Sequence, residues 1–73
     1  MTRNQAEKKV LKAVKRLAEA RKEKGISYQR LSEMTGLHRT ALSLIERGER
    51  TPTLLSYILI ADALGISLVD FSN

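Results

Sequence analysis

The chain has 73 residues, a formal net charge of +5 and no cysteine, so we expect one small domain without disulfides or a cysteine-bound metal. Its single histidine cannot hold a metal ion alone, no apolar run reaches the roughly 18 residues of a membrane span, and the amino terminus lacks the features of a signal peptide. We therefore expect a cytoplasmic protein without a metal, cofactor or small-molecule ligand, whose pI of about 10.0 points to an anionic partner.

Most of the positive charge lies in the first third of the chain. Residues 1–24 contain nine Lys or Arg and three Glu, whereas residues 25–73 contain four Arg and five acidic residues. A solubilising helix face would explain this bias, and so would attraction to the phosphates of a nucleic acid. A membrane-surface helix is disfavoured, because its apolar face would contain neither Trp nor Phe.

The first predicted element is a helix over residues 6–24. Its apolar positions recur at helical spacing and form one stripe: Val10, Leu11, Val14, Leu17 and Ala18. Arg21 lies on the same stripe. Gly25 ends the helix, and the two lysines of its last turn suit the negative end of the helix dipole.

The second predicted helix covers residues 28–35. Ser27 caps its amino-terminal end, and Leu31 and Met34 are expected to face inward. Gly36 then makes a tight turn to the next helix.

The third predicted helix covers about residues 39–47 and ends at Gly48. With the second helix and the glycine turn it forms a helix-turn-helix pattern at about residues 27–47. Its apolar face, expected to pack on the core, contains Ala41, Leu42 and Ile45. Its opposite face contains Arg39, Thr40, Ser43, Leu44 and Arg47. An α-helix fits the major groove of B-form DNA, where arginine bonds guanine and threonine or leucine meets the methyl group of thymine. The alternative is that the two arginines are solvated surface residues.

The fourth predicted helix covers about residues 54–64. Its cap is either Thr51, with Pro52 at the first helical position, or Thr53, and the sequence does not decide between them. Ser67 caps a last short helical turn, LVDF. No segment alternates with period two for long enough to form a strand, so we expect an all-α fold of five short helices around one core.

Several short motifs occur in the order and spacing of one family. They are Gly25-Ile26-Ser27, Leu31, Gly36, IERG at residues 45–48, Pro52, and IADALGIS at residues 60–67. In these motifs the chain resembles the Cro/C1-type, or XRE-family, helix-turn-helix proteins over about residues 8–71. The HRT segment at residues 38–40 is similar to the small controller proteins of restriction–modification systems. The resemblance implies a compact lambda-repressor-like domain spanning residues 1–73 and a sequence-specific regulator of transcription that binds double-stranded DNA.

The resemblance also implies roles for individual residues. Base reading falls to Arg39, Thr40, Ser43 and Leu44. Phosphate contacts fall to Tyr28, Gln29, His38, Arg47 and Arg50. Tyr28 stands where similar proteins commonly carry a glutamine. In similar proteins an arginine late in the first helix pairs with the glutamate of the IERG segment, which implies an ion pair between Arg21 and Glu46; a DNA contact by Arg21 is the alternative.

The carboxyl-terminal part is more apolar than the family pattern requires. The usual core positions are filled by Leu54, Tyr57, Ile60, Ala61 and Leu64. Further apolar residues, expected to form a homodimer interface, are Leu55, Leu59, Val69 and Phe71. A two-fold dimer would read a pseudo-palindromic operator. The alternatives are scattered surface leucines, a thicker core, or an antitoxin- or coactivator-type module whose apolar patch holds a partner protein. An enzyme is not expected, because the chain has no glycine-rich phosphate loop and no nucleophile with a nearby base.

Overall fold

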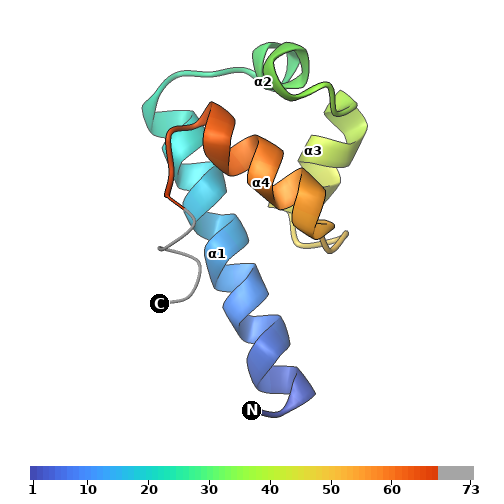
Figure 1. Ribbon diagram of the computed structural model, residues 1–73. Coiled ribbons are helices and arrows are strands. Elements are labelled where there is room, and N and C mark those ends of the chain that lie inside the picture. Colours follow the sequence, from blue (N-terminus) through green and yellow to red (C-terminus); the bar gives the residue numbers. More distant parts are fainter. Residues whose placement is uncertain (68–73) are drawn as a thin grey trace.

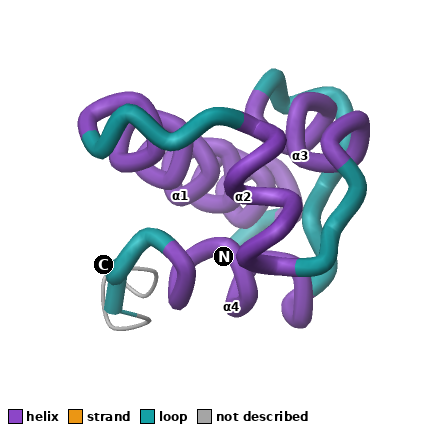
Figure 2. Tube along the Cα trace, turned by 90° about the horizontal axis from the view of Figure 1, so that it is seen from above, coloured by secondary structure: helices purple, strands orange, loops and turns teal. Residues whose placement is uncertain are grey.

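The computed structural model describes residues 1–67, which form four helices joined by short loops (Figure 1). The helices are α1 (Arg3–Glu23), α2 (Tyr28–Thr35), α3 (Arg39–Glu46) and α4 (Leu54–Ala63). Along this part of the chain the trace contains helices and loops and no strand (Figure 2), which confirms the all-α prediction. The predicted fifth helix falls on residues 68–73, outside the described range, so the described residues contain four helices rather than five.

The first helix begins three residues earlier than predicted because of a reciprocal cap at its start. The hydroxyl of Thr2 accepts a hydrogen bond from the backbone N–H of Gln5 at 3.2 Å, and the Gln5 side chain accepts one from the Thr2 N–H at 2.8 Å. This capping box satisfies two amide groups that the start of a helix leaves without partners. Its polar residues carry no apolar periodicity, which is why the stripe alone placed the start too late.

The core lies where the other three helices meet the carboxyl-terminal half of α1. Its buried members are Ala13, Val14, Leu17, Leu31, Leu42, Ile45, Tyr57, Ile60, Ala61 and Leu64. α3 packs against both α1 and α2, and α2 also packs against α4. Residues 3–12 contribute no buried side chain, and this half of α1 extends beyond the rest of the bundle (Figure 1).

Four apolar residues lie further from the core than predicted. Met34, Leu11 and Leu54 are 42%, 51% and 70% exposed, and Ala41 is half-buried. Each sits at an edge of the bundle: Leu11 is on the extended half of α1, and Leu54 is in the first turn of α4. α2 is so short that Leu31 is its single buried residue, which leaves Met34 at its far end. Helical spacing identifies a face but not how much of that face a neighbour covers.

The start of the fourth helix settles the choice of cap. The hydroxyl of Thr53 accepts a hydrogen bond from the backbone N–H of Ser56 at 3.0 Å, so Thr53 is the cap and Pro52 precedes it. α4 then ends at Ala63, one residue short of the prediction. None of the helices in residues 1–67 is long and apolar enough to cross a membrane.

Candidate nucleic-acid interface

The third helix has one buried face and one that is open. Leu42 and Ile45 are 1% and 3% exposed and anchor α3 in the core. On the other side Arg39 and Thr40 are exposed, and Ser43 and Leu44 are half-buried. All four predicted base-reading residues therefore share the outward side of one helix. Arg39 has no hydrogen-bond or ion-pair partner among the described residues, so its guanidinium is free to bind a ligand.

The chain's one histidine caps this helix. The Nδ1 atom of His38 accepts a hydrogen bond from the backbone N–H of Thr40 at 3.1 Å. When the neutral ring accepts through Nδ1, its proton lies on Nε2, which remains a hydrogen-bond donor. His38 is exposed at the amino-terminal end of α3, so its Nε2–H group can donate a hydrogen bond to a ligand.

The turn between α2 and α3 is held by two hydroxyl groups. The Ser32 hydroxyl donates to the carbonyl of Leu37 at 2.6 Å. The Thr35 hydroxyl donates to the carbonyl of Leu31 at 2.8 Å and accepts from the Leu37 N–H at 3.1 Å. Gly36 adopts a φ of 78°, a left-handed conformation that favours glycine. Neither hydroxyl was singled out in the sequence, although Ser and Thr in the last turns before a glycine are the available signal.

An ion pair joins the last turn of α1 to the last residue of α3. The Nε atom of Arg21 donates to Oε2 of Glu46 at 2.7 Å, and Nη2 donates to Oε1 at 3.0 Å. A third donor, Nη1, binds the backbone carbonyl of Ile26 at 2.8 Å. The two side chains are only 11% and 8% exposed. The hydrogen bonds that Arg21 donates to Glu46 raise the pKa of Arg21 and outweigh the opposing effect of burial, so the guanidinium stays charged. The pairing expected between these two residues is thus present.

Tyr28 belongs to the same cluster, where its hydroxyl has a partner within the protein, and its assignment as a phosphate contact stays a prediction. Its hydroxyl donates to Oε1 of Glu46 at 3.0 Å, and the guanidinium carbon of Arg21 lies 4.2 Å from the centre of its ring. Burial, and then the hydrogen bond to Glu46, raise the pKa of Tyr28. The hydroxyl proton is therefore used inside the protein, because the long side chain folds back onto α3 instead of projecting from the head of α2.

The other three predicted phosphate contacts are exposed. Gln29 is the second residue of α2. Arg47 follows the last residue of α3 and pairs with Glu49 at 3.0 Å, with side chains 58% and 56% exposed. Arg50 lies in the loop after Gly48. The loop keeps close to α3 because the N–H groups of residues 49 and 50 both donate to the Leu44 carbonyl, at 2.9 and 3.2 Å.

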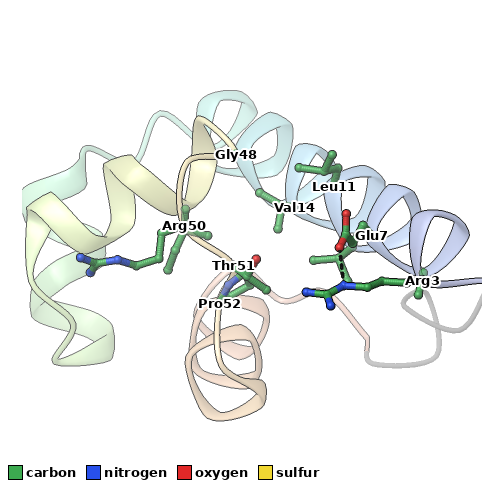
Figure 3. Close-up of a pocket in the computed structure, with 11 residues that line it drawn as sticks. Arg3, Glu7, Leu11, Val14, Gly48, Arg50, Thr51 and Pro52 are labelled. Atoms are coloured by element: carbon green, nitrogen blue, oxygen red, sulfur yellow. Dashed lines mark hydrogen bonds and ion pairs between the residues drawn. The ribbon is translucent and has the colours of Figure 1, made fainter.

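A cavity of about 500 Å³ lies between this loop and the extended half of α1. It is lined by Arg3, Ala6, Glu7, Val10, Leu11, Val14, Ile45, Gly48, Arg50, Thr51 and Pro52. Figure 3 shows Arg3 and Arg50 on opposite sides of it, with Arg3 bound to Glu7 at 3.0 Å. Elsewhere in residues 1–67 no three His, Cys, Asp or Glu side chains gather as a metal site would require.

The predicted dimer residues are only partly within the described chain. Leu55 is 68% exposed and follows Leu54, which is 70% exposed, so the start of α4 carries an apolar pair open to solvent. Leu59 is half-buried. Val69 and Phe71 lie outside the described residues, and the interface remains a prediction.

Sequence comparisons bear on this architecture. The family model HTH_3, described as helix-turn-helix, matches residues 17–71. The chain is similar to an uncharacterized HTH-type transcriptional regulator, y4dJ, of Sinorhizobium fredii, with 38% identity over 73% of this chain and 69% of that protein. It is also similar to the control protein C.SmaI of Serratia marcescens, with 44% identity over 59% of this chain and 51% of that protein.

A third relative is the HTH-type transcriptional regulator PuuR of Escherichia coli, with 35% identity over 78% of this chain and 31% of that protein. The chain thus spans about half the length of the control protein and less than a third of PuuR. No solved structure matches the chain significantly. The family match covers α2, α3, α4 and the last turns of α1, so it includes the whole of α3 with its open face. The chain therefore belongs to the XRE-type helix-turn-helix family of transcriptional regulators.

Proposed function

We propose that this chain is a transcriptional regulator that reads a pseudo-palindromic operator in double-stranded DNA as a homodimer. The observation that carries the proposal is the open face of α3. Arg39 stands unpaired at the start of a helix whose opposite side is fixed in the core by Leu42 and Ile45. A free guanidinium on a rigid helix is the group that most often reads a guanine.

Base reading follows from the chemistry of this face. The Arg39 guanidinium can donate two hydrogen bonds to O6 and N7 of one guanine. Thr40 and Leu44 can place methyl groups against thymine, and the Ser43 hydroxyl can bind a neighbouring base edge. Because α3 has only eight residues, one copy reads only a few base pairs. A second copy, related by a two-fold axis, would read the other half-site about one helical turn away.

Phosphate contacts would fix the register of the helix in the groove. The exposed candidates are Gln29 on α2 and, before and after α3 in the chain, His38, Arg47 and Arg50. Arg47 would break its ion pair with Glu49 to reach a phosphate. The free-energy cost of breaking it is small, because an exposed ion pair contributes only about 0–1 kcal/mol. The exposed lysines of α1 add long-range attraction and faster encounter, which weaken as salt rises.

A binding titration of two variants tests the proposal, with an operator first selected from random duplexes. Arg39→Ala should weaken the binding free energy for that operator by about 1–3 kcal/mol and relax the preference for one guanine. Lys12→Ala, on an exposed face of α1, should weaken binding slightly and equally on every sequence. An Arg39→Ala variant that keeps both its affinity and its preference would exclude this docking of α3.

A further inference from the structure

We propose that Tyr28 is a positioning residue for DNA reading: it sets the orientation of α3 through Glu46 and does not itself touch DNA. This inference rests on the proposed function. It starts from a three-residue cluster, Arg21, Tyr28 and Glu46, which we call the clasp. Its members come from the last turn of α1, the first residue of α2 and the last residue of α3.

The clasp has few free hydrogen-bonding groups. Oε1 of Glu46 receives two hydrogen bonds, from Arg21 and from the Tyr28 hydroxyl, both at 3.0 Å. The guanidinium of Arg21 is held at its edge by Glu46, at Nη1 by the Ile26 carbonyl, and on its face by the Tyr28 ring 4.2 Å away. Contacts from three directions leave the guanidinium little freedom to rotate. Tyr28 supplies two of the cluster's contacts, its ring and its hydroxyl.

α3 depends on such an anchor because it is short. Only Leu42 and Ile45 of its eight residues are buried. Both lie on one side, so the orientation of α3 about its own axis also depends on contacts at its two ends. Glu46 fixes the carboxyl-terminal end against a roll about that axis, while the Ser32 hydroxyl on α2 ties down the turn before α3 at the other end. A roll on the order of 10° reaches the limit of geometry within which a recognition group stays productive.

The mode of action assigned to Tyr28 differs from a phosphate contact in a measurable way. A side chain that touches phosphate contributes to binding on every sequence, because every sequence presents phosphates. A side chain that orients α3 contributes only where Arg39 and its neighbours meet the correct bases. Loss of the Tyr28 hydroxyl should therefore lower the ratio of specific to non-specific affinity and leave non-specific affinity unchanged.

The test compares Tyr28→Phe with Tyr57→Phe, the same chemical change at the chain's other tyrosine, which is buried in α4. Both are measured well below their unfolding transitions on the selected operator and on a scrambled duplex. Tyr28→Phe should lower the ratio of the two affinities roughly three- to tenfold, whereas Tyr57→Phe leaves the ratio unchanged. In a Glu46→Met background, which removes the acceptor oxygens but keeps a side chain of similar length, Tyr28→Phe should change the ratio less than twofold, because the hydroxyl acts through the carboxylate.

Equal losses on both duplexes, which leave the ratio unchanged, would show a phosphate contact and overturn the proposal, and so would unchanged affinities on both duplexes. Hydrogen exchange of the α3 amides in the DNA-free protein separates this proposal from the proposed function. Faster α3 exchange in Tyr28→Phe than in Tyr57→Phe supports the positioning role even if the parent shows no sequence preference, an outcome that would refute the function alone. Unchanged α3 exchange overturns the positioning role.

Discussion

Replacing Glu46 by alanine removes the carboxylate that holds both Arg21 and Tyr28. The two charged side chains are 11% and 8% exposed, so the variant leaves a guanidinium in the interior without its counter-charge. Removing one partner of a buried pair lowers the free energy of unfolding by about 3–5 kcal/mol. A domain of this size is stable by about 4–11 kcal/mol in total. At about 4–8 °C per kcal/mol, the midpoint of thermal unfolding should fall by at least roughly 12 °C.

Thermal and urea unfolding followed by far-UV circular dichroism measure this loss. Glu49→Ala is a matched control, because its pair with Arg47 has a similar distance, 3.0 Å, but both side chains are more than half exposed. The free energy of unfolding of Glu49→Ala should fall by less than about 1 kcal/mol. If both variants unfold within a few degrees of the parent, the reasoning that burial makes the Arg21 pair strong is refuted.

Three further results follow from the described contacts. Because burial and Glu46 raise the pKa of Tyr28, the folded protein keeps the phenolic proton that the unfolded chain loses near pH 10. The free energy of unfolding should therefore fall as the pH rises above about 10, and Tyr28→Phe should reduce that slope; equal slopes in alkaline urea titrations would contradict the assignment. Gly48→Ala and Gly65→Ala, at φ values of 75° and 71°, should each lower the free energy of unfolding by about 1–2 kcal/mol. At Gly48 the new methyl group would lie 3.2 Å from Leu11, but that half-exposed side chain can move, so the two losses should be similar. A much larger loss at Gly48 would show that Leu11 is held rigidly. Leu55→Lys should sediment as a monomer, and its circular dichroism should not change because this side chain is 68% exposed. A variant that dimerises like the parent would show that Leu55 is not part of the interface.

Local signals in the sequence predicted the helix-turn-helix closely. α2 begins after Ser27 and ends before Gly36, as predicted, because a hydroxyl cap and a left-handed glycine act on their own neighbours. The end of α3 was placed one residue too late, since Arg47 is its cap. The start of α1 was missed, because a polar capping box leaves no mark on apolar periodicity.

Contacts between helices were harder to predict. The pairing of Arg21 with Glu46 came from the family resemblance, since the two residues are 25 positions apart. Nothing in the local sequence shows that the Tyr28 side chain turns toward α3, because that choice depends on where α3 packs. The exposure of Met34 and Leu54 likewise depends on where a neighbouring helix stops. Spacing along one helix therefore separates the two faces of α3, and only the assembled bundle shows which polar groups remain free.

The central claim is that the open face of α3 reads base sequence, and selection from random duplexes tests it most directly. The parent chain and Arg39→Ala are taken through the same selection, and the bound sequences are compared. The parent should enrich a two-fold symmetric sequence with a guanine in each half-site, and Arg39→Ala should lose that guanine while keeping the flanking positions. Enrichment of the same sequence by both proteins, or of none by the parent, would contradict the claim.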